Sequence, residues 1–409
     1  MIAVCRAVNA DPQFVNKLKR NQEEEIRPCL RCNACIANYQ TRITKCAINP
    51  TLDRPEDEVF PFLPTTPKRV LIAGGGPAGL EAAIVAKDRG HEVILCEKTG
   101  TLGGLLRYAR KVPFKRETQQ YVDYMIAKRP HGRGYPAEHR GHPRAGKGHR
   151  PRLLYRRRGS KALIPPIPGV EKAHPIMDMY DGKVQVGQKV VIVGGGLAGT
   201  EAALELAMQG KQVTLVEMGI DVARDANSIH KPALMMELKD HAEQVTILRR
   251  TTCTGIHDHG IVCRDADGKE LTLDADTVIL AAGMAPLRAE ALALEPVSSE
   301  FRMVGDCKRP RQILEAVREG YDAAMGGLRR HPDAPMREDP IPGPGTCAGP
   351  GTYFWRRTAQ ANKTASAHRR RRSCSVSGGT PPLSGPGQSK AWRGGLTSTP
   401  TRPAPPGSR

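Results

Sequence analysis

Two stretches of the chain repeat one pattern, and this repeat constrains the fold more than any other feature. Residues 70–97 read VLIAGGGPAGLEAAIVAKDRGHEVILCE, and residues 190–217 read VVIVGGGLAGTEAALELAMQGKQVTLVE, at a constant offset of 120 residues. In each copy an apolar run typical of a strand meets G-x-G-x-x-G, and a helical pattern, a second apolar run and a glutamate follow. This order is the full context of a dinucleotide-binding βαβ unit, so the sequence predicts two nucleotide sites.

The three motif glycines of each copy have distinct roles. Gly74 allows the tight turn that leaves the strand, Gly76 lets backbone N–H groups approach a pyrophosphate, and Gly79 lets the helix lie close to the strand. In the second copy these roles fall to Gly194, Gly196 and Gly199. The phosphates are expected at the N-terminus of each helix, where the helix dipole and the free N–H groups favour an anion.

A glutamate closes each copy, Glu97 in the first and Glu217 in the second. A carboxylate at this place can accept hydrogen bonds from both hydroxyls of an adenosine ribose. It also repels a 2′-phosphate, so Glu217 favours NADH over NADPH. A single G-x-G-x-x-G would also suit a glycine-rich turn in some other α/β protein, but two copies in full context favour nucleotide binding.

Two further segments indicate which cofactor each copy binds. Gly103 and Gly104, in TLGGLL, permit close passage of the backbone along a flat ligand. Further on, Gly305 and Asp306 stand between an expected strand and an expected helix. An acid there can bind the ribityl chain of a flavin while the helix N-terminus faces the pyrimidine edge, although an ordinary helix N-cap is the alternative for Asp306. We therefore predict FAD in the first copy and NADH in the second.

Four cysteines precede the first copy. Cys29, Cys32 and Cys35 are spaced C-x2-C-x2-C, and Cys46 follows after ten intervening residues. Three closely spaced thiolates with a remote fourth are typical of iron–sulfur proteins, whereas structural zinc more often uses two separated C-x2-C pairs. The spacing favours an iron–sulfur cluster, with zinc and unligated thiols as the alternatives.

With these motifs, the chain up to about Leu328 resembles the C-terminal half of the 2,4-dienoyl-CoA reductase, trimethylamine dehydrogenase and NADH:flavin oxidoreductase family. Members join an FMN-bearing TIM barrel of the old yellow enzyme type to a 4Fe–4S segment, an FAD domain and a nucleotide domain. The opening AVCRAVNADPQFVNKLKRNQEEEIRPC resembles the end of that barrel. The resemblance implies a 4Fe–4S cluster on the four cysteines. Most of the barrel has no counterpart here, so no catalytic residue is predicted, and FMN is expected only with a barrel partner.

The resemblance implies an electron relay. NADH would reduce FAD, FAD would reduce the cluster, and the electrons would reach FMN in a barrel that reduces activated C=C bonds of the enoate or dienoyl-CoA type. We expect either a separately encoded barrel or a chain that is a fragment of such an enzyme. A degraded or frameshifted gene product with little activity is the main alternative. A stand-alone NADH:acceptor diaphorase and a basic nucleic-acid-binding protein are further alternatives.

The formal net charge of +20 comes from two segments. Residues 128–161 hold 12 Lys and Arg against one acid, and residues 329–409 hold 14 against three. Both segments are rich in Gly, Pro, His and Arg, lack helical or strand periodicity, and carry no interleaved aromatics or fold motif for RNA. We therefore expect neither segment to build a core and predict no specific nucleic-acid partner.

The first basic segment falls where the family pattern requires a strand, a helix and a second strand. Arg156, Arg157 and Arg158 resemble an Ala-Ala-Val strand translated one base out of frame, because codons for Ala-Ala-Val read as Arg-Arg-Arg after a shift of one base. We hypothesise that both basic segments are out of frame in the gene or its assembly, with a true disordered insertion as the alternative.

Cellular location follows from the cysteines and from the start of the chain. No apolar run is long enough to span a membrane, and MIAVCRAVNA lacks the features of a secretory signal. Of 11 cysteines, four are grouped as ligands and others, such as Cys96 and Cys263, lie in apolar strand patterns. This usage indicates a reducing cytoplasm rather than a disulfide framework or a membrane.

The expected fold is α/β, with two Rossmann-like, doubly wound nucleotide-binding domains, the second inserted in the first, preceded by a TIM-barrel remnant and an Fe–S segment. We expect each domain to be a parallel sheet covered by helices on both faces. Gly283 ends the strand that returns the chain from the inserted domain and allows close passage of a ligand. We assign residues 1–28 to the barrel remnant, 29–64 to the Fe–S segment, 68–127, 161–180 and 270–328 to the FAD domain, 128–160 to an anomalous basic segment, 186–269 to the NADH domain and 329–409 to a disordered basic tail.

Overall fold

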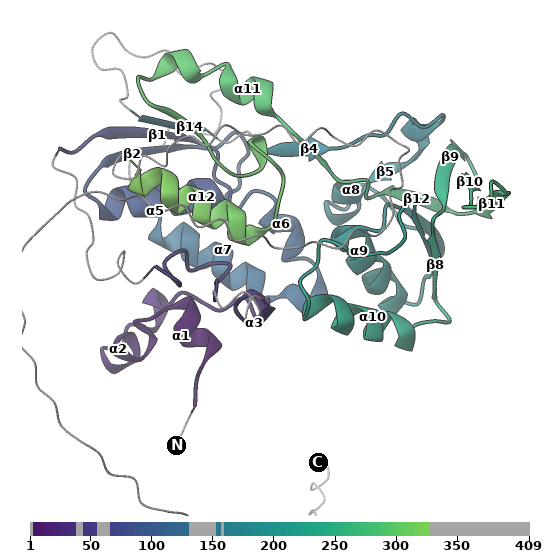
Figure 1. Cartoon of the computed structure of the whole chain (residues 1–409), viewed down its shortest axis with the longest axis horizontal. Helices are drawn as coiled ribbons and strands as arrows, with labels where there is room; N and C mark the ends of the chain where they lie inside the picture. Colours follow the sequence, from purple (N-terminus) through teal and green to yellow (C-terminus); the bar gives the residue numbers. More distant parts are fainter. Residues whose placement is uncertain (1–2, 38–43, 55–65, 131–152, 157–158, 327–409) are drawn as a thin grey trace, which may run out of the picture. The chain divides into compact units, whose positions relative to one another are not determined.

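The computed structural model describes residues 3–37, 44–54, 66–130, 153–156 and 159–326 (Figure 1). All of them belong to one compact unit of the chain, Met1–Pro335. Its two largest sheets are wholly parallel, and each contains one copy of the repeated pattern. Within the described ranges, no helix combines the length and the apolar character that crossing a membrane requires.

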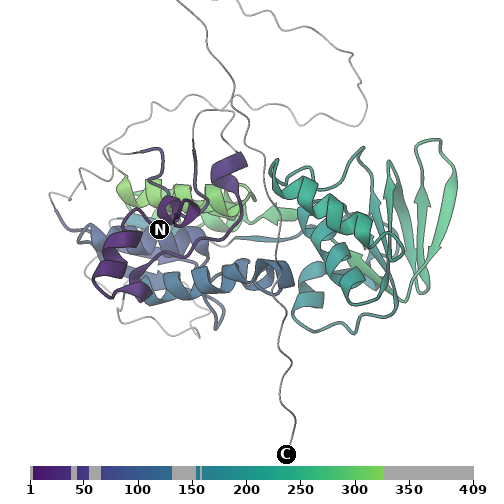
Figure 2. The same ribbon diagram turned by 90° about the horizontal axis from the view of Figure 1, so that it is seen from below.

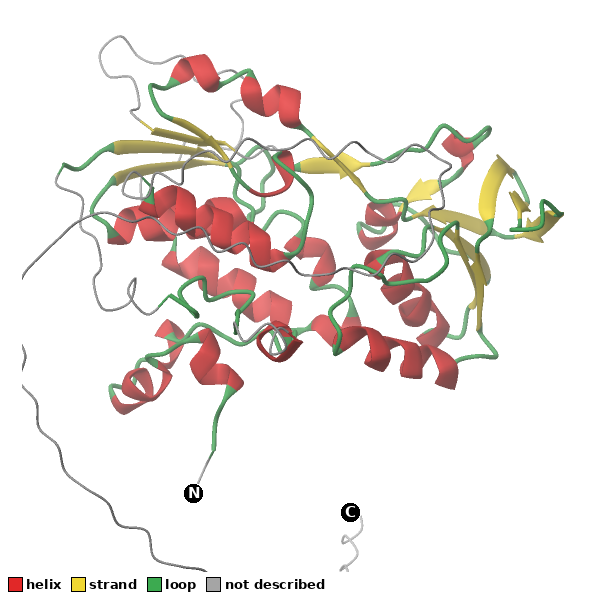
Figure 3. Ribbon diagram, viewed as in Figure 1, coloured by secondary structure: helices red, strands yellow, loops and turns green. Residues whose placement is uncertain are grey.

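The first sheet has the strand order β14–β3–β1–β2. Its strands are β1 (Arg69–Ala73), β2 (Glu92–Cys96), β3 (Leu153–Arg156) and β14 (Phe301–Met303). Helices α5 (Pro77–Asp88) and α12 (Ile313–Met325) cover one face, with α7 (Glu117–Lys128) packed on α5, while α11 (Arg288–Leu292) and η5 (Glu295–Val297) lie over the other face (Figure 3).

Alternation along β1 explains this two-sided cover, because successive side chains of a strand point to opposite faces. Val70 and Ile72 pack among the alanines of α5 and α12, whereas Leu71 packs against Leu294. The small residues let the two helices approach closely: a Cβ on Gly320 of α12 would lie 2.2 Å from the carbonyl oxygen of Ala78. Glycine is therefore required at this crossing.

The second sheet has the strand order β5–β12–β6–β7–β8. Its strands are β5 (His174–Pro175), β6 (Lys189–Val193), β7 (Gln212–Glu217), β8 (Val245–Arg249) and β12 (Thr277–Leu280). Val190 and Ile192 face the helices α8 (Ile176–Tyr180), α9 (Leu197–Met208) and α10 (His230–Asp240). Val191 and Val193 face the opposite way, toward Ile256 of a smaller sheet.

The smaller sheet corrects one expectation, that helices cover both faces of each parallel sheet. The strands β9 (Thr252–His257), β10 (Gly260–Arg264) and β11 (Glu270–Asp274) form an antiparallel sheet over the second face instead. A signal for it was present, since Asp267–Gly268 is a favoured hairpin turn and Gly268 has φ +82°. The fold class itself, an α/β protein with Rossmann-type domains, is confirmed.

β3 lies inside the basic segment that we expected to lack strand structure. Its backbone pairs in parallel with β1, from Val70 opposite Leu153 to Ala73 opposite Arg156, and with β14 on its other side. The expectation is therefore wrong for these four residues. A ladder of backbone hydrogen bonds needs no particular side-chain periodicity, which explains the difference. Residues 131–152, 157–158 and 327–409 lie outside the described residues, so the hypothesis of a shifted frame stays untested.

The N-terminal segments lie along α5, α7 and α12 (Figures 1 and 2). They contain α1 (Arg6–Ala10), α2 (Phe14–Lys19), η1 (Glu23–Glu25) and α3 (Ala34–Ala37). Cys46 and Ile48 are buried against Leu80, Tyr121 and Val317. An ion pair of 2.6 Å between Arg318 and Asp53 adds a polar tie to α12. The cysteine segment is thus part of the same core as the helix that follows the first glycine turn.

Candidate functional site

The first glycine turn has the geometry that its sequence predicted. Gly74 has φ +117°, a conformation that disfavours any side chain, and its N–H donates to the carbonyl oxygen of Cys96 at 2.5 Å. A Cβ on Gly79 would lie 2.0 Å from the carbonyl oxygen of Gly74. Gly76 is the N-cap of α5. The strand therefore turns directly into the helix, and the N-terminus of α5 is left for an anion.

Glu97 holds this turn from the end of β2. One carboxylate oxygen accepts the N–H of Gly75 at 2.7 Å, and the other accepts the N–H and the hydroxyl of Thr99, both at 2.9 Å. The predicted ribose-binding acid is therefore fixed beside the glycine turn by its own hydrogen bonds.

The structure brings the predicted TLGGLL segment to the same turn. Gly103 has φ +98° and Gly104 φ +55°, and the N–H of Gly103 donates to the carbonyl oxygen of Gly75 at 2.7 Å. Both conformations favour glycine. The segment continues into α6 (Leu106–Ala109).

Gly305 and Asp306 follow β14, which runs parallel to β1 with β3 between them, so they lie at the same edge of the sheet as the glycine turn. Gly305 has φ +68°, and its N–H donates to Glu319 at 2.6 Å. Asp306 is buried in η6 (Gly305–Cys307) and accepts a bond of 3.3 Å from the hydroxyl of Ser160.

Gly283 lies where the chain returns to the first domain, between β12 and β13 (Met284–Pro286). Its φ is +102°, and its carbonyl oxygen accepts the N–H of Leu163 at 3.0 Å. β13 pairs with β4 (Ser160–Ala162), whose first residue, Ser160, contacts Asp306.

The second glycine turn repeats the first. Gly194 has φ +111°, and a Cβ on Gly199 would lie 2.0 Å from the carbonyl oxygen of Gly194. Glu217 accepts the N–H of Gly195 at 2.7 Å and the N–H of Gly219 at 2.6 Å. A pocket of about 350 Å³ opens at this turn. Its lining combines the expected Gly196 and Glu217 with Gly195, Asp221, Arg224 and Asp225.

Sequence reasoning missed the three charged residues of this pocket. Asp225 accepts the N–H of Leu197, the first residue of α9, at 2.8 Å. Asp221 pairs with Lys231, whose hydrogen bond holds the pKa of Asp221 below its usual value. Extending the comparison of the two copies past Glu217 identifies Arg224 and Asp225. At an offset of 120 residues they correspond to Gly104 and Leu105 of the first copy.

The loop between the cysteines has an unusual backbone. Arg31 and Asn33 have φ of +54° and +58°, so two residues other than glycine adopt the left-handed conformation on either side of Cys32. The side chain of Asn33 accepts a bond of 2.6 Å from Arg6. Strain of this kind is found where the surrounding structure fixes a functional loop.

The four predicted ligands are free thiols, three of them half-buried and Cys46 buried. Burial raises the pKa of Cys32 to about 11 and raises that of Cys46. Backbone N–H groups point at three sulfurs: Arg31 at Cys29, at 3.4 Å, Ala34 at Cys32, and Ile48 and Asn49 at Cys46. Such N–H···S bonds are a feature that tunes iron–sulfur sites.

The arrangement of the four thiols decides what this segment can hold. Among the described residues, no three His, Cys, Asp or Glu side chains gather closely enough to hold one ion. Cys29, Cys32 and Cys46 nevertheless pack in one cluster, and Cys29, Cys35 and Cys46 each add to the rise in the pKa of Cys32. A set of four neighbouring thiols with N–H donors, packed on α5, suits the chemistry of a larger iron–sulfur group.

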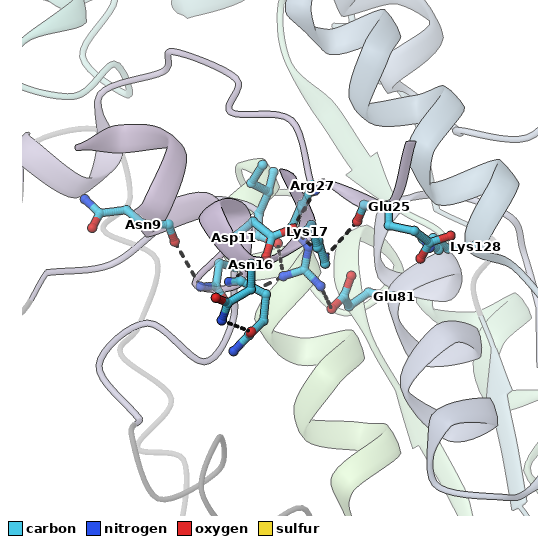
Figure 4. Close-up of polar contacts among 11 residues, drawn as sticks. Asn9, Asp11, Asn16, Lys17, Glu25, Arg27, Glu81 and Lys128 are labelled. Carbon is cyan, nitrogen blue, oxygen red and sulfur yellow. Dashed lines mark hydrogen bonds and ion pairs between the residues drawn. The ribbon is translucent and has the colours of Figure 1, made fainter. Parts of the chain in front are cut away.

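An ion pair with a buried carboxylate joins the residues just before Cys29 to α5 (Figure 4). Arg27 lies 3.7 Å from Glu81, whose side chain is only 2% exposed, and also donates to the carbonyl oxygen of Ile48 at 3.0 Å. The backbone N–H of Arg27 donates to Asp11 at 2.8 Å. Sequence reasoning did not single out Arg27 or Glu81.

The second domain contacts the first through named side chains. Lys115, in η3 (Pro113–Lys115), lies 2.6 Å from the buried Glu201 of α9, and His230 lies 2.8 Å from the same carboxylate. Asn227 donates to the carbonyl oxygen of Cys32 at 2.9 Å. The loop beside the second pocket thus touches the cysteine segment directly.

Comparison with known families assigns each copy separately. The family described as FAD dependent oxidoreductase matches residues 69–133, which contain the first glycine turn. The family described as pyridine nucleotide-disulphide oxidoreductase matches residues 158–300, which contain the second.

Relatives match over most of the chain. The chain is 33% identical over 342 residues to an NADH oxidase of Thermoanaerobacter brockii and 34% identical over 344 residues to a bilirubin reductase of Mediterraneibacter gnavus. Each match covers 79% of this chain and 51% of the relative, so the chain spans about half the length of these curated relatives. A solved complex of 2-naphthoyl-CoA reductase with 2-naphthoyl-CoA superposes with a TM-score of 0.69 at 28% identity, covering 78% of this chain and 49% of that one.

Proposed function

Because the chain belongs to the 2,4-dienoyl-CoA reductase-type family, matches its C-terminal half and is an FAD-dependent oxidoreductase, we propose that it passes electrons from NADH through FAD to a 4Fe–4S cluster. The cluster would be held by Cys29, Cys32, Cys35 and Cys46. The observation that carries this proposal is the burial of the cysteine segment against α5, the helix that opens at the first glycine turn. The electron donor and the electron acceptor would therefore lie on one core.

The residues of the first site would bind and orient FAD. The N-terminus of α5 would receive the pyrophosphate, Glu97 the adenosine ribose, and Asp306 the ribityl chain. When bound, FAD accepts two electrons from a nicotinamide and gives them up one at a time. A Cβ on Gly103 would lie 3.0 Å from Val122, so glycine lets the segment pack on α7 while its N–H reaches the glycine turn.

The residues of the second site would bind NADH in the same manner. Gly194, Gly196 and Gly199 shape the turn, and Glu217 would accept the ribose hydroxyls. Glu217 as a residue is 9% exposed, and its carboxylate accepts hydrogen bonds from two backbone N–H groups. A fixed negative charge there supports NADH as the preferred nucleotide over NADPH.

The final acceptor would be an FMN barrel, encoded separately or as a further part of the same enzyme. Relatives named bilirubin reductase and 2-naphthoyl-CoA reductase support reduction of activated C=C bonds as the reaction there. No residue of this chain is proposed as a proton donor to that substrate. We also propose a cytoplasmic location, supported by the free thiols of the cysteine segment.

The test is an anaerobic NADH titration of protein reconstituted with FAD, iron and sulfide. We expect the flavin absorbance to bleach and the paramagnetic signal of a reduced cluster to appear with it. Bleaching together with dye reduction but without a reduced cluster would support a diaphorase and overturn the relay. A protein that holds no FAD would support the degraded or frameshifted alternative.

A further inference from the structure

The two nucleotide turns can be compared position by position beyond their closing glutamates. Gly103 and Ala223 are 120 residues apart, and both have positive φ, +98° and +47°. Each donates its N–H at 2.7 Å to the carbonyl oxygen of the middle glycine of its turn, Gly75 or Gly195. The offset that relates the two copies therefore holds in the structure as far as these residues.

The next residues of the two copies differ in charge. The first copy continues with Gly104 and Leu105, and the second with Arg224 and Asp225. The first residue of the helix differs as well, because α5 begins with Pro77, which has no N–H, and α9 begins with Leu197. The first residue of the helix therefore offers an N–H to a carboxylate only in the second copy.

That contact is present. Asp225 accepts the N–H of Leu197 at 2.8 Å, and a Cβ on Gly196 would meet only Asp225, at 3.9 Å. The carboxylate thus occupies the N-terminus of α9, where a pyrophosphate binds in a dinucleotide fold. A pyrophosphate that takes the N–H of Leu197 therefore has to displace this carboxylate.

The backbone around Asp225 is fixed from three sides. Ala223 is held by Gly195, Gln312 of the first domain donates to the carbonyl oxygen of Asp225, and Asn227 donates to Cys32. These bonds hold the loop in place, while Asp225 itself is exposed. Rotation of one exposed side chain is therefore enough to open the anion position.

We propose that Asp225 is an affinity-determining residue that competes with the nucleotide pyrophosphate at the second site. Its competition makes this site release its nucleotide readily, as a substrate such as NADH requires. The first site, with Pro77 and Leu105 at the matching positions, retains its nucleotide, as a resident cofactor requires. This inference rests on the proposed function of the two sites.

The test compares NAD⁺ affinity, by calorimetry on the FAD-loaded protein, in the wild type and in Asp225→Asn and Asp225→Ala. Removing the charge should tighten NAD⁺ binding about tenfold, because the repulsion and the competition are both lost. The matched control is Asp276→Asn. It removes the same charge just before β12, a strand of the same second sheet, but its carboxylate accepts the N–H groups of Gln188 and Lys189 at the other end of β6.

A second readout separates competition from a purely structural role. Asp225→Ala removes the acceptor of Leu197, so the nucleotide-free protein should unfold at a lower temperature while it binds NAD⁺ more tightly. Unchanged or weaker NAD⁺ binding by both Asp225 variants, with normal binding by the wild type, would overturn the inference. Failure of every variant and of the wild type to bind NAD⁺ would instead overturn the proposed function.

Discussion

Glu81 and Glu201 lie at the same position of the two duplicated helices, 120 residues apart, and each buried carboxylate pairs with a cationic side chain from an earlier part of the chain. Arg27, two residues before Cys29, lies 3.7 Å from Glu81, and Lys115 of the first domain lies 2.6 Å from Glu201. The equivalent glutamates of α5 and α9 therefore have the same role, because each joins its nucleotide domain to the part of the chain before it.

The pair of Arg27 and Glu81 should affect the free energy of unfolding mainly when one partner is removed, because the other charge then stays buried and unpaired. Arg27→Met leaves the carboxylate of Glu81 buried without its cationic partner, which should lower the free energy of unfolding by about 3–5 kcal/mol. The double variant Arg27→Met/Glu81→Leu should recover most of this loss, because no buried charge remains. Urea unfolding of the wild type, Arg27→Met, Glu81→Leu and the double variant measures both effects. A double variant as unstable as Arg27→Met would contradict the explanation.

The same pair predicts a pH dependence. Burial raises the pKa of Glu81 above 4.5 although Arg27 acts in the opposite direction. The folded protein then binds this proton more tightly than the unfolded chain does, so the contribution of Glu81 to stability falls as the pH rises from about 4.5 through the raised pKa. The free energy of unfolding of the wild type minus that of Glu81→Gln should therefore decrease with rising pH in this range. An increase would show that the pairing with Arg27 outweighs burial.

The cysteine assignment predicts the metal content. Protein purified without oxygen should contain about four iron atoms and about four sulfides per chain, with negligible zinc, as expected for one 4Fe–4S group. Cys46→Ser should abolish the bound iron, whereas Cys307→Ser, which changes a buried thiol after β14, should not. Stoichiometric zinc without sulfide would refute the assignment.

Glu217 should determine which nicotinamide nucleotide is used. Glu217→Ala should weaken the use of NADH and improve the use of NADPH, because the ribose hydrogen bonds and the repulsion of a 2′-phosphate are lost together. Since Glu217 also holds Gly195 and Gly219, Glu217→Gln is the control that removes the charge and keeps the size. Steady-state reduction of a dye with each nucleotide measures the preference. A wild type that already prefers NADPH would disprove this role.

The sequence predicted those features that depend on local backbone chemistry. Gly74 and Gly194 need positive φ, and Gly79 and Gly199 have no room for a Cβ, so their spacing alone indicated two turns with the observed geometry. Contacts between distant segments could not be derived this way. Arg27 meets Glu81 only after the cysteine segment packs on α5, and nothing in the local pattern of either residue encodes that packing.

Two other misses have different causes. The turn at Asp267–Gly268 indicates a hairpin, and this hairpin forms part of the antiparallel sheet on the second domain. The alternation of strands and helices along the chain predicts helices there instead. β3 was missed because the strand depends on pairing with two neighbours rather than on its own periodicity. Its sequence, LLYR, begins apolar and ends with Arg156 beside the glycine turn. Functional sites are where a sequence is expected to depart from the usual strand pattern, and β3 ends beside the proposed FAD site.

The last prediction concerns this strand. β3 joins β14, and with it Gly305 and Asp306, to β1 and the first glycine turn, so the two halves of the proposed FAD site depend on one ladder. Leu154→Pro removes a backbone donor from the middle of that ladder, and proline is hardly found in a central strand. We expect this variant to lose FAD and to aggregate, whereas Leu154→Val, which keeps the N–H and suits a strand, should retain FAD. The ratio of flavin to protein after gel filtration measures the difference. Equal flavin content in the two variants would show that β3 does not hold the site together.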